Sequence, residues 1–214
     1  MKKFLKVTVN GSSYDVVVEE VKEGEVNMKY FKKLIGDNIY LSPRNSEDVE
    51  KYTEWLNDFE VTDYTGRSAG VLTLEGEKKY LEQHIGDEAC FAIVRVEDNE
   101  LIGSVSLEQI SHIHRGATLG IFIGDKSGRN KGYGTEAVRL ILDYGFNYLN
   151  LNNINLHVME FDDRAIACYK KCGFKEYGRR RKCYFLNGKY YDKIEMDILA
   201  EEFNGDYIKN KNIK

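Results

Sequence analysis

Arg129-Asn130-Lys131-Gly132-Tyr133-Gly134-Thr135 is the stretch of sequence that decides the fold. It follows an apolar, alternating run at 117–124 and precedes an amphipathic segment at 134–149, so it joins a strand to a helix. The first turn of a helix leaves backbone N–H groups unpaired, and the helix dipole favours an anion there. The glycines let the backbone approach a phosphate closely, while Arg129 and Lys131 add cationic donors. The stretch therefore predicts a pyrophosphate site.

Other interpretations of this loop fit less well. A nucleotide-binding P-loop would end in Gly-Lys followed by Ser or Thr, which is absent here. A dinucleotide-binding loop would need three glycines and an acidic ribose ligand on the next strand. Taken alone, the stretch could also be an ordinary glycine-rich turn, so its meaning depends on the rest of the chain.

The segments before the loop follow strand and helix patterns in turn. Ile39-Tyr40-Leu41 is a short apolar strand, and Ser46 can cap the helix that follows it. A polar stretch at 60–72 then leads to a second helix near 74–85. The inward face of the first helix is expected to consist of Val49, Tyr52, Trp55, Leu56 and Phe59.

The order of the remaining elements predicts an α+β fold. They are strands at 91–96, 101–107 and 154–158, a helix at 164–172 that ends at Gly173, and a hairpin at 181–199 that turns at Asn187-Gly188. We therefore expect a central mixed sheet with helices on both faces.

Period-two alternation on both sides of Asn10-Gly11 predicts a β-hairpin at the N-terminus. We treat residues 1–36 as a hairpin extension of unknown role, for packing or for formation of a homodimer. Residues 37–204 form the main domain in this division, and 205–214 form a polar tail.

The composition describes a globular, mildly acidic chain. Of its 214 residues, 42% are hydrophobic and 31% are charged, which allows both a core and a solvated surface. The formal net charge of −4 disfavours a broad surface for nucleic acid or anionic membrane. No apolar run approaches the roughly 20 residues that cross a bilayer, and no export signal is evident, so we expect a cytoplasmic protein.

The four cysteines are expected to be reduced thiols. Cys168 and Cys172 share a helix face, but no second pair follows at metal-binding spacing. We interpret each cysteine, Cys90 and Cys183 included, as a small buried hydrophobic residue, and we expect no metal.

Two linked motifs give the chain a specific resemblance to a known family. The stretch 117–137 resembles the central motif of the GCN5-related N-acetyltransferases (GNAT), and 162–174 resembles their second cofactor segment. The resemblance covers residues 38–203 and is closest to the branch with ribosomal-protein alanine and spermidine acetyltransferases, because 187–192 and Met196 recur near the end of that branch. It implies a mostly antiparallel GNAT sheet and acetyl-CoA as the co-substrate.

The resemblance also implies which residues bind acetyl-CoA. The pantetheine arm is expected to pair like an additional strand with the backbone of Ile121, Phe122 and Ile123, where the sheet splays. Many members carry an asparagine where this chain has Asp162, which cannot donate a hydrogen bond when ionised, so we expect that contact to be weakened. The pyrophosphate is expected to bind the amides of Arg129, Asn130, Lys131, Gly132, Tyr133, Gly134 and Thr135.

Tyr169 matches the tyrosine that commonly protonates the departing thiolate in this family, although by position alone it could equally be a core aromatic residue. The general base stays unassigned. Relatives often carry a glutamate at the position of Thr118, whose hydroxyl cannot act as a base near neutral pH. Glu108, His112 or His114 could act through water, or each could be a solvated loop residue.

The resulting interpretation is direct attack of a primary amine on the thioester in a ternary complex, with the Phe122 amide polarising the carbonyl. A polyamine, an aminoglycoside and a protein N-terminus all remain candidate acceptors. The segment 60–72 is expected to select among them, with Tyr64 lining the cleft and Asp58, Glu60 and Asp63 attracting a cation, although it could equally be a polar surface loop. The alternatives are a catalytically silent acyl-CoA sensor and an interaction module on the same scaffold.

Overall fold

The main feature of the fold is an eight-stranded sheet in the order β3-β4-β5-β6-β7-β8-β10-β9. The computed structural model describes residues 2–9, 12–19, 29–84, 86 and 89–212. Neighbouring strands of the sheet are antiparallel except β7 and β8, which are parallel. The strands are β3 (Leu34–Ile35), β4 (Ile39–Pro43), β5 (Cys90–Arg95), β6 (Leu101–Ser111), β7 (Gly116–Ile123), β8 (Asn153–Met159), β9 (Lys175–Leu186) and β10 (Lys189–Leu199).

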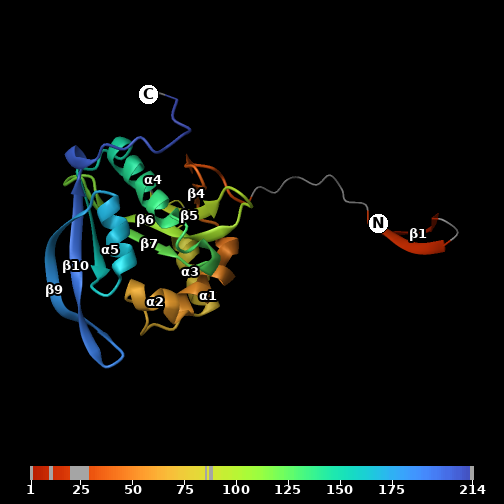
Figure 1. The fold of residues 1–214 in the computed structure, drawn as a ribbon, viewed down its shortest axis with the longest axis horizontal. Helices are drawn as coiled ribbons and strands as arrows, with labels where there is room; N and C mark the ends of the chain where they lie inside the picture. The colour runs from red at the N-terminus through yellow and green to blue at the C-terminus, as the bar shows by residue number, and fades with distance from the viewer. Residues whose placement is uncertain (1, 10–11, 20–28, 85, 87–88, 213–214) are drawn as a thin grey trace.

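Helices cover both faces of this sheet (Figure 1), which confirms the expected α+β architecture. One hydrophobic cluster lies between the sheet and the pair α4 and α5, and a second lies under α1 and α3 on the opposite face. The amphipathic pattern predicted for 134–149 is confirmed in α4, where Val138, Ile141 and Leu142 are all fully buried. The helices are α1 (Val49–Asn57), α2 (Phe59–Thr65), α3 (Leu74–Gln83), α4 (Tyr133–Asn147) and α5 (Asp163–Lys171).

The parallel strands β7 and β8 separate soon after they begin. They pair only between residues 116–118 and 153–155, so from Leu119 onward the described part of β7 is paired with β6 alone. Backbone N–H and C=O groups that a sheet would normally pair are thus left open on one side of β7. The splay lies at the strand where the family resemblance implied it.

The region around α1 and α2 differs from its prediction. The helical turn before α1 is capped by Asn45, whose side chain accepts a hydrogen bond from the Glu47 amide, and not by Ser46. Phe59 begins a separate helix, α2, and is 64% exposed, so it is no part of the inward face of α1. No helix was predicted in the polar stretch at 60–72, yet residues 60–65, nearly half of it, belong to α2, which Asp58 caps through the Glu60 amide.

The last elements follow their predictions closely. Gly173 follows α5 with φ of +102°, the left-handed conformation that glycine adopts without strain. Asn187 and Gly188 both have positive φ between β9 and β10, as a tight two-residue hairpin turn requires. β9 begins at Lys175, six residues earlier (181 − 175) than the sequence predicted.

The two terminal segments differ in their contacts. The N-terminal strands pair with each other, whereas the segment near the C-terminus packs against the main domain. β1 (Lys2–Val9) and β2 (Ser12–Glu19) form a separate antiparallel pair, while the expected turn residues Asn10 and Gly11 lie outside the described residues. Near the other end, Ile208 is 5% exposed in the main core, and its amide donates to buried Asp143 of α4. The segment that contains Ile208 therefore packs against α4.

Candidate active site

The splay of β7 from β8 opens into a cavity of about 450 Å³. It runs from the cofactor loop and the start of α4, past β7, to α1, α2 and α3 on the other face of the sheet. All the predicted cofactor-binding residues except Lys131 line it. They are Ile121, Phe122, Ile123, Arg129, Asn130, Gly132, Tyr133, Gly134, Thr135 and Asp162, together with the predicted acid Tyr169.

The loop presents open backbone groups to this cavity. Gly132 caps α4 with φ of +85°, so a glycine is required there by conformation. A side chain at Gly132 would meet no atom within 4 Å, which leaves the space over the helix start free for a ligand. The first hydrogen bond of the helix runs from the Glu136 amide to the Gly132 carbonyl, so the preceding amides have no partner within α4. This arrangement suits a pyrophosphate.

The cation of the loop is paired with an acid from α2. The Arg129 guanidinium lies 3.0 Å from the Glu60 carboxylate, and Lys126 lies 3.0 Å from the same group and 3.6 Å from Asp58. Hydrogen bonds from Lys126 and Arg129 hold the pKa of Glu60 below its ordinary value. Glu60 therefore connects α2 to the cofactor loop, a link between distant segments that the sequence pattern did not indicate.

Tyr169 projects from α5 into the inner part of the cavity. It is 8% exposed, and its ring lies edge-on to Phe174 with 5.8 Å between centroids. Burial, with Cys168 and Asp162 nearby, raises the pKa of the Tyr169 phenol well above its ordinary value, so the hydroxyl stays protonated at neutral pH. A neutral, buried phenol beside the cofactor strand can donate a proton.

Three of the four thiols are more accessible than expected. Only Cys172 is buried, whereas Cys90, Cys168 and Cys183 are partly exposed, and none of the four forms a disulfide with a described residue. Cys168 lines the cavity, and its Sγ lies 3.2 Å from the Thr135 hydroxyl at the start of α4. A hydrogen bond from Cys172 lowers the pKa of Cys168 to about 7. The prediction that each cysteine is a buried hydrophobic residue holds for Cys172 alone.

Asp162 lines the cavity and also caps α5. Its Oδ1 accepts a hydrogen bond from the Ala165 amide at 3.1 Å. Burial raises the pKa of Asp162, although the bond from Ala165 acts in the opposite direction. A carboxyl group that retains its proton can donate, as the asparagine common in the family does.

The face of the sheet opposite α4 carries polar groups beside the splay. Glu108 pairs in register with Thr118, and the Thr118 hydroxyl lies 3.1 Å from Asn155 Oδ1 on β8. Glu108, Thr118 and His157 all line the cavity, whereas His112 and His114 do not. Sequence reasoning missed His157, because its place within the strand pattern at 154–158 gave no sign that it faces a site.

His157 is suited to accept a proton. Its side chain keeps an exposed surface, but partial burial and the neighbouring Lys193 lower the pKa of His157 below its ordinary value, with Glu195 and Glu108 opposing. The imidazole is therefore neutral at pH 7. Its position makes it a second candidate base beside Glu108.

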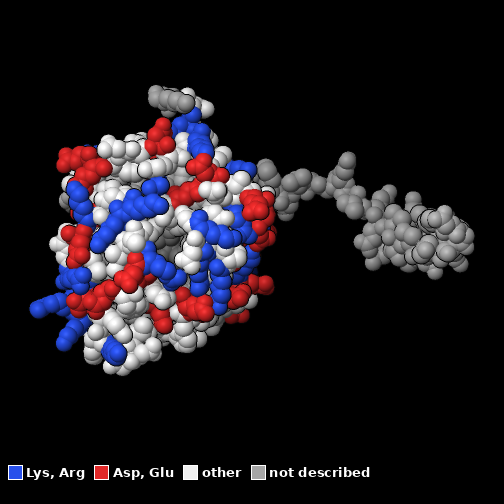
Figure 2. All heavy atoms as spheres, in the orientation of Figure 1, with Lys and Arg blue, Asp and Glu red and all other residues white. Residues whose placement is uncertain are grey.

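The acids expected to attract a cationic acceptor are largely engaged with other groups. Glu60 is paired with Lys126 and Arg129, and Asp63 accepts a hydrogen bond from Ser68 at 2.6 Å. Asp58 and Asp63 do not line the cavity. Side chains of both charges occur over the face of the molecule in Figure 2.

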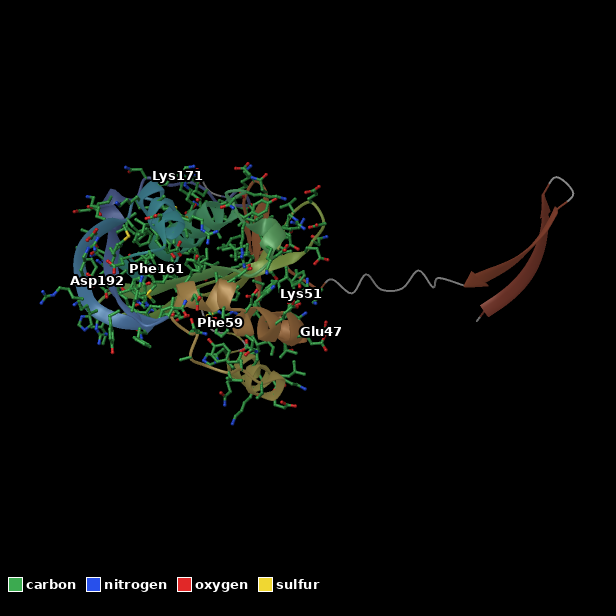
Figure 3. The ribbon with its side chains drawn as sticks, turned by 60° about the horizontal axis from the view of Figure 1, so that its bottom comes forward. Glu47, Lys51, Phe59, Phe161, Lys171 and Asp192 are labelled. Carbon is green, nitrogen blue, oxygen red and sulfur yellow. The ribbon has the colours of Figure 1, made fainter. Side chains whose placement is uncertain are left out.

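Tyr64 lines the cavity as expected and belongs to an aromatic cluster. Phe161, just beyond β8, lies between α2 and the β9–β10 hairpin (Figure 3), with ring centroids 5.8 Å from Tyr64 and 4.8 Å from Tyr191. The Ser68 hydroxyl lies 3.0 Å from the Tyr184 hydroxyl of β9. The β9–β10 hairpin thus contacts the α2 region beside the cavity.

Within the described residues, no group of three or more His, Cys, Asp or Glu side chains is arranged to hold a metal ion. None of their helices combines the length and the apolar character that crossing a membrane would require.

The open start of α4, the splayed parallel strands and the buried Tyr169 line one cavity, an arrangement suited to an acyl-CoA-dependent transferase. The sequence profile described as "Acetyltransferase (GNAT) domain" matches residues 38–175, so the chain belongs to the GNAT family of N-acetyltransferases. The predicted family and enzyme class are thereby confirmed.

Related proteins and similar solved structures support this assignment. Spermidine N(1)-acetyltransferase of Escherichia coli is 31% identical over 170 residues, which is 79% of this chain and 90% of that protein. The crystal structure of spermidine N-acetyltransferase from Vibrio cholerae in complex with CoA and spermine has a TM-score of 0.71 at 29% identity, covering 77% of this chain and 97% of that one. A dodecameric structure of the Vibrio cholerae enzyme has a TM-score of 0.66 at 30% identity, covering 77% and 95%.

Proposed function

We propose that the protein transfers the acetyl group of acetyl-CoA directly to a primary amine within a ternary complex. The observation that carries the proposal is that Tyr169, the open side of β7 and the free amides at the start of α4 line one cavity. Cofactor and acceptor can therefore meet there without a covalent enzyme intermediate. The named relatives are N-acetyltransferases, which supports the same reaction.

In this proposal the cofactor lies along β7. The pyrophosphate binds amides between Arg129 and Thr135, and the pantetheine arm pairs with residues 121–123 as an additional strand. The Phe122 amide polarises the thioester carbonyl, which stabilises the negative charge that develops on its oxygen. Cofactor binding replaces part of the pairing between Arg129 and Glu60, because the pyrophosphate competes for the same guanidinium.

Tyr169 protonates the leaving thiolate, and a group on the opposite face receives the proton of the amine. Glu108 and His157 are placed for the second role, Glu108 through water. The variants Glu108→Gln and His157→Gln separate them. Loss of the acidic limb of the pH profile for kcat/KM in only one variant identifies the base, because the limb reports protonation of that group.

The acceptor is a primary amine, and polyamines head the list of compounds to test because the named relatives act on spermidine. Release of CoA thiol is measured with spermidine, spermine, an aminoglycoside and a peptide with a free N-terminus, with the Tyr169→Phe variant as the control. Acetylation of at least one amine, confirmed by mass spectrometry of the product, is the expected result.

A catalytically silent acyl-CoA sensor is the second candidate, favoured by Thr118 at the position of the common glutamate. Binding of acetyl-CoA by calorimetry, with no thiol release from any amine in the panel, would exclude the enzyme in favour of the sensor.

The role of residues 1–36 and the oligomeric state belong to the same proposal. We propose a homo-oligomer to which the β1–β2 hairpin contributes, and the relative from Vibrio cholerae forms a dodecamer. Mass in solution and turnover are compared for the full chain and for a chain without residues 1–28. A lower mass with unchanged turnover assigns the hairpin to assembly.

A further inference from the structure

The cavity continues beyond the groups of the proposed reaction to a polar end between α1, α3 and the sheet. This end is lined by Arg44, Tyr52, Glu77 and Ser104. Arg44 lies between β4 and α1, Tyr52 on α1, Glu77 on α3 and Ser104 on β6. None of these side chains has a role in the acetyl transfer described above.

The polar end lies beside the part of β7 that is expected to hold the thioester. The Tyr52 ring meets the Phe122 ring edge-on, with 6.3 Å between centroids, and Ser104 pairs in register with Phe122. A group held at this end is thus near the reacting atoms, within the same continuous cavity.

Two hydrogen-bond donors at this end have no protein partner. Arg44 Nε and the Tyr52 hydroxyl are buried, and neither has a hydrogen-bond partner in the described part of the protein. Tyr52 is only 2% exposed. Buried polar groups are nearly always paired, so two unpaired donors lining one cavity indicate that a ligand completes them.

The neighbouring acceptors do not meet this need. Ser104 donates its hydroxyl hydrogen to the Phe91 carbonyl at 3.0 Å, and although its oxygen keeps lone pairs that could accept, the Tyr52 hydroxyl forms no hydrogen bond with it. Oδ1 of Asp48 is taken by Lys29 at 2.5 Å and by the Tyr30 hydroxyl at 2.8 Å, while its Oδ2 is buried and forms no hydrogen bond with any described residue. Among the residues that the structure describes, no carboxylate forms an ion pair with Arg44.

The charge at this end favours an anion. Arg44 and Arg67 both line the cavity there, with Glu77 as the acid between them. Burial raises the pKa of Glu77, although Arg44 and Arg67 act in the opposite direction. Burial thus disfavours the negative charge of Glu77, while the guanidinium groups remain charged at any ordinary pH.

We propose that Arg44 and Tyr52 bind a carboxylate carried by one of the two substrates, an inference that rests on the proposed acetyl-transfer function. The planar guanidinium and the phenol hydroxyl present donors that match the two oxygens of a carboxylate. The carboxylate belongs either to the acceptor, as in an ω-amino acid, or to the far end of the acyl group, as in a dicarboxylic acyl-CoA.

The test uses matched ligands that differ in the carboxylate. Each member of a short series of ω-amino acids is compared with the alkylamine of the same chain length, and succinyl-CoA is compared with acetyl-CoA. Calorimetric affinity, measured in the presence of CoA for the amines, is recorded beside kcat/KM. The first comparison reports an acceptor carboxylate, and the second reports an acyl carboxylate.

In one of the two comparisons, Arg44→Met is expected to weaken binding of the carboxylate-bearing member by about tenfold or more. Its carboxylate-free counterpart should be unaffected, and Arg44→Lys should recover part of the loss. Tyr52→Phe, which retains the ring, should cause a smaller loss for the same ligand. Arg181→Met, on the exposed face of β9, is the control, and thermal unfolding checks that each variant is folded.

The outcomes separate this inference from the proposed function. Acetylation of amines with no carboxylate preference in either comparison, and no effect of Arg44→Met, would overturn the carboxylate site while leaving the acetyltransferase intact. A carboxylate preference in binding that depends on Arg44, without turnover of any amine, would support the site and count against the proposed function.

Discussion

Among single residues, Tyr169 is expected to have the largest effect on turnover. Tyr169→Phe removes the proton donor but retains the ring that packs on Phe174, so kcat should fall about a hundredfold or more while KM for acetyl-CoA changes little. Because the phenol pKa is raised, the wild-type rate should persist well into the alkaline range. Steady-state kinetics check this, with the exposed Tyr177→Phe as the control, and a turnover near wild type would show that the assigned role is wrong.

Asp162 should make cofactor affinity depend on pH. Its pKa is raised by burial, so the proton that allows donation to the cofactor arm is retained in mild acid and lost as pH rises. KM for acetyl-CoA should therefore increase with pH in the wild type. Asp162→Asn donates at every pH and still caps α5, so its KM should be flat and about three- to tenfold lower at alkaline pH. Parallel profiles for the two proteins would contradict this account.

The sequence was informative about residues whose role follows from a local motif. The loop around Gly132, Asp162 and Tyr169 lie within two short motifs at fixed spacing, and most of these residues line one cavity. Arg44, His157 and the pairing of Glu60 with Arg129 were not predicted. Each depends on residues from distant segments that meet only when the sheet forms, and no local pattern encodes such a meeting.

At the scale of elements, the packing of α1 against the end of β7 depends on the close approach of Trp55 to Gly124. A Cβ added at Gly124 would overlap the Trp55 ring, so this glycine is required for close approach. Gly124→Ala should destabilise the protein by about 1–3 kcal/mol, because α1 must move away. Urea unfolding measures the change, with Gly178→Ala, which meets no atom within 4 Å, as the matched control. Equal stability of the two variants would show that α1 adjusts freely.

Helices and strands with a regular burial pattern were predicted most accurately from the sequence. α4 has a continuous inward stripe and was placed within about two residues of its observed bounds, as expected for a strongly periodic segment. α2 is a short helix that begins at the exposed Phe59, so its start gave no helical stripe to read. The splay of β7 from β8 was expected only because of the family resemblance, since alternation along a strand does not reveal its neighbours.

At the scale of the whole molecule, Asp143 connects α4 to the segment near the C-terminus. Its side chain is fully buried and accepts hydrogen bonds from Lys211 Nζ at 2.7 Å and from the amides of Tyr207 and Ile208. Lys211→Met should lower the free energy of unfolding by about 2–3 kcal/mol, because a buried charge loses its partner. Lys209→Met, which breaks an exposed pair with Asp37, should cost less than about 1 kcal/mol. Similar losses in both variants would contradict the prediction.

The same carboxylate predicts a dependence of stability on pH. Burial alone would raise the pKa of Asp143, but the hydrogen bonds from Lys211, Asn147, Ile208 and Tyr207 outweigh it and leave the pKa lowered. A lowered folded-state pKa contributes stability above the unfolded value, and this contribution disappears as pH falls through the folded value. Thermal unfolding between neutral and acidic pH should show a steeper loss for the wild type than for Asp143→Asn.

The packing of α1 on the cofactor strand also provides an optical signal. Trp55 is the sole tryptophan of the chain, and its indole lies against Gly124 and edge-on to Phe122, with 6.3 Å between ring centroids. Tryptophan fluorescence, excited at wavelengths where the 15 tyrosines absorb little, therefore comes from one reporter beside the proposed cofactor strand. Titrating the unlabelled protein with CoA, and then with candidate amines, can reveal the order in which the two substrates bind.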